Sequence, residues 1–185
     1  RDRSVSRGLG DVYKRQDQVD FIGYFDASRL GIISRKDENI APFTLLADVC
    51  GKQVGAGAGT TQLLRLDTAS KECVAAGKAA IDVAVFPDRP AGVQAVVSGR
   101  VAMFFGPYEG LTYQVSKVDA LTMSGQITVN DAPVSIAFAK QSPLEDAVQA
   151  ALNSLIKDGT YQQILDMWNI GYGAVKAANR NQEIF

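Results

Sequence analysis

The sequence predicts an α/β fold in which parallel strands are joined by crossover helices. Strand-like apolar segments and helical segments alternate three times between Lys52 and Val118. This alternation is typical of βαβ units, whose strands are parallel because each connecting helix returns the chain to the same edge. The clearest unit spans Lys52–Gln62, where a strand of small residues is followed by a glycine turn and the start of a helix.

Composition limits the classes of function. The 185 residues are 46% hydrophobic and 21% charged with a net charge of −1, which is typical of a globular protein with one large domain or two small ones. A near-neutral chain gives no reason to expect nucleic acid or an anionic membrane surface as a partner. The absence of histidine excludes His-based triads and His-ligated zinc, and two cysteines are too few for a cysteine-rich metal site. We therefore expect no metal and no cofactor.

The first sixteen residues differ from the rest. Arg1–Gln16 is basic and has almost no apolar periodicity. It looks like translated adapter sequence of the kind found at the edges of assembled reads, and the alternative is a disordered basic tail. We leave it out of the fold prediction and expect the true N-terminus to be missing.

Three elements are expected up to the first helix. Leu30–Ile33 is a strand-like apolar run, and Ile40–Asp48 is a connector that carries a short helical turn. Lys52–Gly57 is a strand. Thr60 or Thr61 suits the N-cap of the helix that follows, and this helix ends near Gly77.

The middle of the chain continues the alternation. Its β-branched and apolar runs predict strands, and the proline, glycine and serine residues between them mark helix ends and turns. The expected order is strand Ile81–Phe86, turn Pro87–Pro90, helix Ala91–Val97, strand Val101–Phe105, helix Pro107–Val118 and strand Leu121–Val129.

The C-terminal part predicts a strand and two helices. After a turn at Asn130–Pro133, the strand is Val134–Ala139, and Ser142 with Glu145 predicts a capping box. That helix has the apolar stripe Leu144, Val148, Ala151, Leu152 and Leu155 and ends at Gly159. Thr160 and Gln163 predict a second capping box, with Tyr161, Ile164, Leu165 and Trp168 as the buried face; Ala174–Ala178 is expected to form a last helical turn.

The helix start after Gly59 is the candidate binding feature. Unpaired N–H groups at a helix N-terminus, together with the hydroxyls of Thr60 and Thr61, favour an anion. The segment lacks the lysine of a P-loop and the last glycine of the dinucleotide fingerprint, so nucleotide binding is not predicted. The alternative is an ordinary strand-to-helix turn.

The two cysteines flank this unit. Cys50 precedes its strand and Cys73 lies near the end of its helix. Because the helix runs back antiparallel to the strand, both positions return to one edge, which favours a disulfide and an oxidising compartment. Two buried thiols in a cytosolic protein are the alternative.

From about Gln18 onward, a series of short motifs in order resembles the extracytoplasmic solute-binding proteins of family 3, the polar amino-acid receptors of ABC importers. No single motif is decisive, but their order and spacing together are specific. They are Val19–Phe21, Arg35–Asp37, Cys50–Lys52, Gly59–Gln62, Cys73–Lys78, Ser98–Val101 and Asp158–Tyr161 followed by Trp168.

The resemblance implies a periplasmic-binding-protein-like fold of type II, with two α/β lobes joined by two crossing strands. It implies that residues 17–47 are the remnant of an incomplete first lobe. This segment would include the first crossing strand, Ile32–Lys36. It also implies that residues 48–130 form the second lobe, and that residues 131–185 supply the second crossing, Val134–Ala139, and the C-terminal helices of the first lobe. A lobe without its first elements is expected to leave apolar surface uncovered and to be less stable.

The resemblance also implies a ligand site. The ligand carboxylate would meet Gly59, Thr60, Thr61 and Gln62, and a family arginine would fall at Arg15, which is either a chance match or a true ligand.

The partner for the ligand ammonium departs from the family pattern. The family aspartate eight residues after the glycine of Ser98–Arg100 is replaced by Pro107. Glu109 could substitute, the ligand could lack an ammonium, or the cleft could serve another purpose. Phe105 and Tyr108 would then line a more apolar pocket.

Three functions share this fold. The first is a periplasmic or extracellular, membrane-associated module that captures a small solute, an amino acid or organic acid, and delivers it to an ABC permease. It needs no catalytic groups. The second is a small-acid dehydratase-like enzyme, for which we find no paired acid and base. The third is an effector-sensing domain. The sequence favours the binding module.

Overall fold

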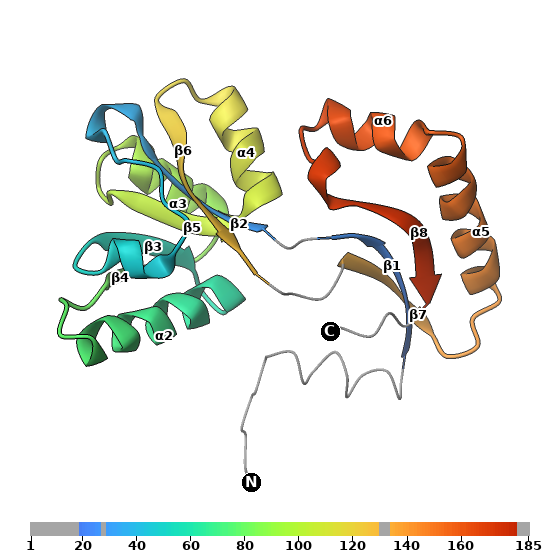
Figure 1. The fold of residues 1–185 in the computed structure, drawn as a ribbon, viewed down its shortest axis with the longest axis horizontal. Helices are drawn as coiled ribbons and strands as arrows, with labels where there is room; N and C mark the ends of the chain where they lie inside the picture. The colour runs from blue at the N-terminus through green and yellow to red at the C-terminus, as the bar shows by residue number, and fades with distance from the viewer. Residues whose placement is uncertain (1–18, 27–28, 130–133, 181–185) are drawn as a thin grey trace, which may run out of the picture. The chain divides into compact units, whose positions relative to one another are not determined.

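The computed structural model describes residues 19–26, 29–129 and 134–180, and the chain divides into two compact units (Figure 1). The first unit is formed by residues 1–28 and 130–185, and the second unit by residues 29–129. The resemblance implied that residues 29–47, as part of the segment 17–47, belong to the first lobe. They belong to the second unit, because β2 (Arg29–Arg35) is an interior strand of its sheet.

The second unit contains a five-stranded mixed sheet in the order β4-β3-β5-β2-β6. β3 pairs in parallel with β4 and β5, which confirms the predicted parallel arrangement, whereas β2 pairs antiparallel with β5 and β6. The other strands are β3 (Gln53–Gly57), β4 (Asp82–Phe86), β5 (Met103–Pro107) and β6 (Leu121–Thr128).

Helices cover both faces of this sheet. α2 (Thr61–Ala75) packs on one face through Leu66, Ala69 and Cys73. α3 (Arg89–Val97) and α4 (Tyr108–Lys117) share the second core, on the other face. Figure 1 shows α2 on the side of the sheet away from α3 and α4. Two short 3-10 turns, η1 (Lys36–Glu38) and η2 (Leu46–Val49), precede β3.

β5 lies two residues later than the predicted Val101–Phe105. The difference follows from the end of α3, where the backbone N–H groups of Arg100 and Val101 both donate to the carbonyl of Ala95, at 2.8 and 3.2 Å. These bonds keep the chain in the helix-terminating turn, so the strand begins only at Met103.

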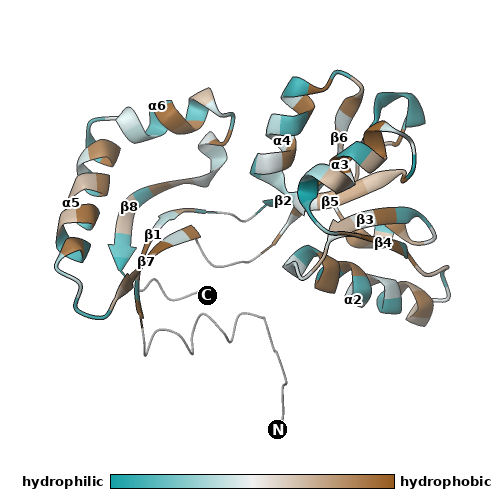
Figure 2. Cartoon of the chain, turned by 180° about the vertical axis from the view of Figure 1, so that it is seen from behind, coloured by the Kyte–Doolittle hydropathy of each residue, from teal (hydrophilic) through white to brown (hydrophobic). Residues whose placement is uncertain are grey.

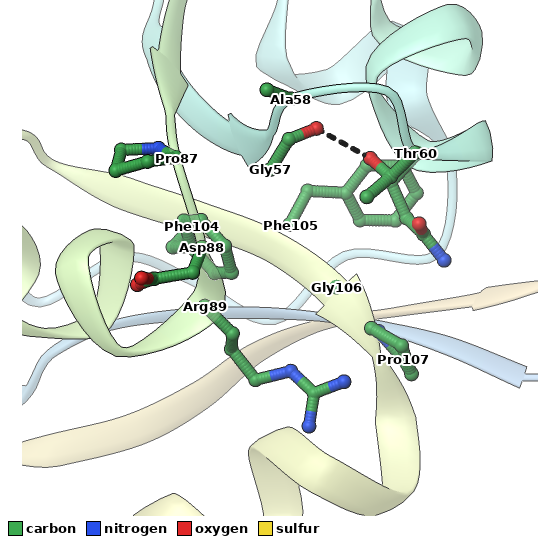
Figure 3. A pocket seen from close by; sticks show the side chains of 11 residues that line it. Gly57, Ala58, Thr60, Pro87, Asp88, Arg89, Phe104, Phe105, Gly106 and Pro107 are labelled. Atoms are coloured by element: carbon green, nitrogen blue, oxygen red, sulfur yellow. Dashed lines mark hydrogen bonds between the residues drawn. The ribbon is translucent and has the colours of Figure 1, made fainter.

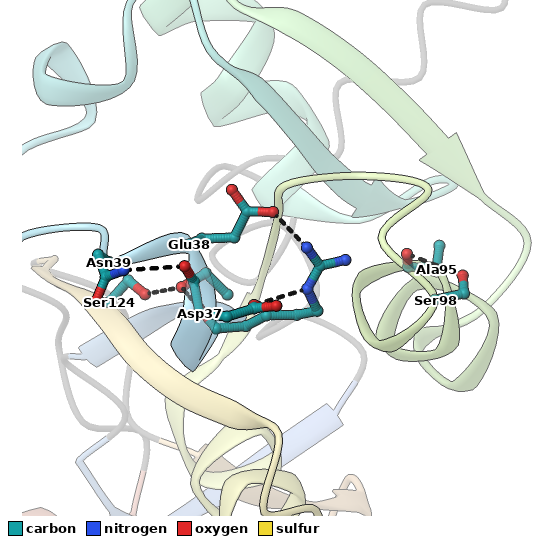
Figure 4. A network of polar contacts seen from close by, with 8 residues as sticks. Asp37, Glu38, Asn39, Ala95, Ser98 and Ser124 are labelled. Atoms are coloured by element: carbon teal, nitrogen blue, oxygen red, sulfur yellow. Dashed lines mark hydrogen bonds and ion pairs between the residues drawn. The ribbon is translucent and has the colours of Figure 1, made fainter.

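A polar network closes the β2 end of the sheet (Figure 4). The Arg35 guanidinium pairs with Asp37 at 2.9 Å and with Glu38 at 2.7 Å, which lowers the pKa of the Asp37 carboxyl. On the neighbouring strands, the hydroxyls of Ser34 and Ser124 share a hydrogen bond in the interior. These contacts satisfy polar groups at the turn from β2 into η1.

A disulfide joins Cys50 to Cys73, with an S–S distance of 2.01 Å and Cα atoms 5.7 Å apart. This confirms the bridge predicted from the strand-turn-helix geometry. It ties the chain just before β3 to the last turns of α2, and the turn between β3 and α2 lies within the closed loop.

The first unit has a three-stranded antiparallel sheet in the order β7-β1-β8. Its elements are β1 (Val19–Phe25), β7 (Val134–Ala139), α5 (Leu144–Lys157), α6 (Thr160–Met167), η3 (Gly171–Gly173) and β8 (Ala174–Arg180). Within the parts of the chain that the structure describes, no helix combines the length and apolarity needed to cross a bilayer.

The expected helical turn at Ala174–Ala178 is wrong, because these residues form β8. The strand pairs with β1, and the Ala178 backbone is held by α5: its N–H donates to Asn153 at 2.8 Å, and its carbonyl accepts from Gln149 at 2.9 Å. Pairing with a distant strand therefore decides the conformation of this short alanine-rich segment.

Neither predicted capping box forms in full. Ser142 supplies its half of the first one, because its Oγ accepts from the Leu144 N–H at 3.4 Å. α5 begins at Leu144, and the Glu145 carboxylate lies 3.3 Å from Arg180 instead of returning to the helix start. At α6, the Thr160 side chain makes no capping bond. The Thr160 N–H donates to the Asp158 carboxylate at 2.9 Å, which lowers the pKa of Asp158.

The first unit has a small core. Tyr161 and Leu165 are buried beside Phe25, and the Tyr161 hydroxyl donates to the Tyr24 carbonyl at 2.6 Å. Ile164 and Trp168, expected on the buried face of α6, are 47% and 56% exposed. The apolar stripe expected on α5 contributes no fully buried residue. Figure 2 shows apolar residues on both helices, and several of these side chains are exposed, among them Leu144 and Met167.

Candidate functional site

The candidate site lies where the parallel strands of the second unit end. β3 is flanked by β4 and β5, and the chain runs from β3 through α2 to β4, then through α3 back past β3 to β5. The carboxyl ends of β3 and β5 therefore face a topological switch point, the usual position of ligand sites in open α/β sheets. The location follows from strand order alone.

A pocket of about 170 Å³ occupies this position (Figure 3). Each of the three strands supplies its last residue or the loop after it, and α2 and α3 supply their first turns. The lining residues are Gly57, Ala58, Thr60, Gln62, Pro87, Asp88, Arg89, Phe104, Phe105, Gly106 and Pro107.

The turn from β3 into α2 is built around Gly59 and Thr60. Gly59 has φ +68°, in the left-handed region that glycine adopts without strain. The Thr60 hydroxyl donates to the Gly57 carbonyl at 2.7 Å and accepts from the Leu63 N–H at 3.2 Å. Thr60 is therefore the N-cap of α2, and its hydroxyl is already engaged within the turn (Figure 3).

Two donors at this helix start remain open. Within the described residues, the backbone N–H groups of Thr61 and Gln62 have no protein acceptor. Gln62 is only 7% exposed, yet its carboxamide has no hydrogen-bond partner among the residues that the structure describes. Among the described residues, neither polar atom of this carboxamide is fully enclosed without a partner, so the group is open to solvent at the pocket wall, where it can hydrogen-bond a ligand with polar atoms.

The charged residues of the lining follow β4. Asp88 is the N-cap of α3, and its Oδ1 accepts from the Ala91 N–H at 2.8 Å. Arg89 is exposed, and it has no ion pair among the described parts of the chain. Asp88 and Arg89 are the two charged residues of the lining. Of these two side chains, only that of Asp88 has a hydrogen bond within the described residues, from the Ala91 N–H.

The remaining wall is apolar. Phe104 and Phe105, both almost fully buried, extend into the two cores on opposite faces of the sheet, and Gly106 and Pro107 complete the end of β5. Pro107 has no polar side-chain atom. The pocket therefore combines open amide donors, one guanidinium and an apolar floor.

The structure brings together part of the predicted set. Thr60, Gln62 and Phe105 line the pocket, and Gly59 shapes its turn. Thr61 is the exposed first residue of α2 and Tyr108 is the half-buried first residue of α4; neither is a lining residue, nor is Glu109. Arg15 and the turn Asn130–Pro133 lie outside the described residues.

Arg89 was not among the site residues expected from the sequence. The segment Pro87–Pro90 was interpreted as a turn, and the residue after its aspartate was given no role. Its position just after a parallel strand was the available signal, because side chains that follow such strands gather at the ligand-binding edge. No cluster of three or more potential metal ligands occurs in the described part of the chain.

Comparison with known proteins identifies the family of the chain. A model of the bacterial extracellular solute-binding proteins, family 3, matches residues 5–171. No curated protein matches the chain.

Solved structures with the same fold include AbpA, an amino-acid ABC transporter substrate-binding protein from Streptococcus pneumoniae bound to L-arginine (18% identity, TM-score 0.66, 85% of this chain and 64% of that chain). A mutant of ArgBP from T. maritima is 26% identical (TM-score 0.63, 84% and 64%). An ancestral arginine-binding protein bound to glutamine is 27% identical (TM-score 0.63, 85% and 66%). This chain spans about two thirds of their lengths.

Proposed function

Because the chain belongs to the bacterial extracellular solute-binding proteins of family 3, we propose that it captures a small carboxylate-bearing solute for an ABC importer. The solute would be an amino acid or a related organic acid, as in the structural neighbours bound to L-arginine and to glutamine. The partner would be an ABC permease at the membrane. The disulfide fits an oxidising compartment outside the cytoplasm.

The observation that carries the proposal is the open carboxamide of Gln62 at the pocket wall. This carboxamide has no hydrogen-bond partner among the described residues, and the two open N–H groups of Thr61 and Gln62 belong to the same first turn of α2. A ligand carboxylate would accept from these donors and from the carboxamide. The positive end of the helix dipole favours the same charge.

The apolar floor would determine how strongly the carboxylate is held. Phe105 and Pro107 exclude water from part of the pocket, and a charge–amide hydrogen bond is stronger where water is absent. The rest of a small solute would lie against these residues. Binding of this kind needs orientation and desolvation but no general acid or base.

The test is isothermal titration calorimetry of the full chain against a panel of amino acids and small organic acids. Gln62→Met keeps the length of the side chain and removes its donor and acceptor, so we expect at least about tenfold weaker binding of any carboxylate that the protein binds. Gln94→Met, at an exposed position of α3, is the matched control and should leave the affinity unchanged.

Equal affinities for Gln62→Met and the unaltered chain would contradict the proposal. So would the absence of heat with every member of the panel. If one of those compounds were chemically converted instead, the dehydratase-like function would replace the binding function.

A further inference from the structure

Arg89 carries a charge that the proposed carboxylate contact does not use. It is the first residue of α3, it lines the pocket, and it has no ion pair among the described residues. Figure 3 shows its guanidinium extended toward Pro107, on the side of the pocket away from Thr60. The pocket thus has anion-binding groups at two separate places.

Gly110 makes room for this guanidinium on α4. A Cβ atom at Gly110 would lie 2.1 Å from Nη1 and 2.8 Å from Cζ of Arg89, so the arginine rests against the helix where only glycine leaves space. Its neighbour Asp88 makes no ion pair with it, and Oδ1 of Asp88 instead accepts from the Ala91 N–H as the N-cap of α3. The packing thus places the Arg89 guanidinium, which has no ion pair in the described part of the chain, near the end of β5.

We propose that Arg89 binds a second anionic group, so that this site prefers a small dicarboxylate. The inference rests on the proposed function: one carboxylate meets the Thr61 and Gln62 amides, and the other meets the Arg89 guanidinium. Guanidinium and carboxylate match in geometry through two parallel N–H···O bonds. A ligand with a cationic distal group would place like charges together, which disfavours basic solutes at this pocket.

Three five-carbon probes differ only at the distal end and separate the two contacts. Glutarate has a second carboxylate, pentanoate has a methyl group, and 5-aminopentanoate has an ammonium. The dissociation constant of each is measured on the full chain at low ionic strength, because salt screens an exposed charge pair. We expect glutarate to bind at least about tenfold more tightly than pentanoate, and 5-aminopentanoate to bind most weakly.

Three variants test whether Arg89 causes the preference for glutarate over pentanoate. Arg89→Gln should weaken glutarate to the level of pentanoate and leave pentanoate within about twofold of its original affinity. Gly110→Ala, which displaces the guanidinium while keeping its charge, should weaken glutarate in the same direction. Lys71→Gln removes one positive charge from an exposed position of α2 and should change neither affinity.

Two outcomes overturn the inference and leave the proposed function standing. One is equal affinity of the unaltered chain for glutarate and pentanoate, and the other is an equal loss for both probes in Arg89→Gln. Failure of the proposed function is different: neither these probes nor any amino acid would bind to the unaltered chain, and the inference would fall with it.

Discussion

Gly92 of α3 lies so close to Phe104 of β5 that a Cβ atom at this glycine would be 2.0 Å from the ring. Phe104 is 2% exposed and packs edge-on beside Phe86, so its ring is held in place by the core. We expect Gly92→Ala to destabilise the chain by about 1–3 kcal/mol through overpacking, measured as the free energy of unfolding in urea.

Gly110→Ala is the matched control for this substitution. It also adds a methyl group to a helix, but it meets only the flexible end of Arg89. The higher helix propensity of alanine should make it neutral or stabilising by up to about 1 kcal/mol. Similar losses in both variants would show that the space around Phe104 is not the cause.

The N-cap of α2 gives a second prediction. Thr60→Ala removes the acceptor of the Leu63 N–H and the donor to the Gly57 carbonyl, and we expect a loss of about 1 kcal/mol in the free energy of unfolding. Thr68→Ala removes only an exposed hydroxyl within the same helix and should cost less than about 0.5 kcal/mol. A smaller effect at Thr60 than at Thr68 would argue against the capping contact.

The disulfide gives a third prediction. Cys50 and Cys73 are 23 residues apart, and in the chain-entropy model such a loop contributes about 3 kcal/mol. The double variant Cys50→Ser/Cys73→Ser should lower the free energy of unfolding by this amount in urea titrations. Adding a reducing agent should destabilise the unaltered chain similarly and leave the double variant unchanged, and an effect on both would point to a different cause.

The Asp158 carboxylate gives a fourth prediction, on pH. The Thr160 N–H stabilises its charged form and lowers its pKa in the folded state. The folded chain therefore releases this proton more readily than the unfolded chain. The resulting stability is present above the unfolded pKa and is lost as the pH falls through the folded pKa.

Asp158→Asn should accordingly melt below the unaltered chain at neutral pH, and the difference in Tm should shrink below about pH 4. Asp67→Asn, which removes an exposed carboxylate from α2, controls for net charge. A difference in Tm that stays constant down to acid pH would exclude the charge of Asp158 as its source.

Local signals predicted most of the second unit. β3, α2 and β4 lie close together in the sequence, and their glycines, cap residue and apolar runs mark the boundaries. The pairing of Cys50 with Cys73 followed from the same local geometry. Element boundaries that depend on tertiary contacts were predicted less accurately. β5 starts at Met103 because backbone hydrogen bonds to the Ala95 carbonyl keep the preceding residues in the turn that ends α3.

The first unit was harder to predict, because its sheet is made by distant residues. β1 has no partner near it in sequence, since Val19 pairs with Ala139 and Ile22 with Arg180. Sequence analysis therefore missed β1 and expected a helical turn in place of β8. The two capping boxes do not form for a related reason. The Glu145 carboxylate forms an ion pair with Arg180, and the Thr160 N–H donates to the Asp158 carboxylate.

The sequence indicated where the candidate site lies but not which charged residues line it. The glycine–threonine turn located the pocket, and Gln62 was among the expected residues. The position of Arg89 at the pocket depends on where β4 ends relative to α4, which no local pattern encodes. Whether a threonine hydroxyl faces a ligand or caps its own helix is likewise a matter of side-chain rotamer, and the sequence permits both.

The pocket-bearing unit is a single uninterrupted segment, residues 29–129, whereas the other unit is assembled from both sides of it. During synthesis, all five strands of the sheet in residues 29–129 leave the ribosome before β7 and β8 do. β1 can form its sheet only after both of these strands have been made. Vectorial synthesis therefore completes the pocket-bearing unit before its companion, and β1 stays without its two neighbouring strands in the interval.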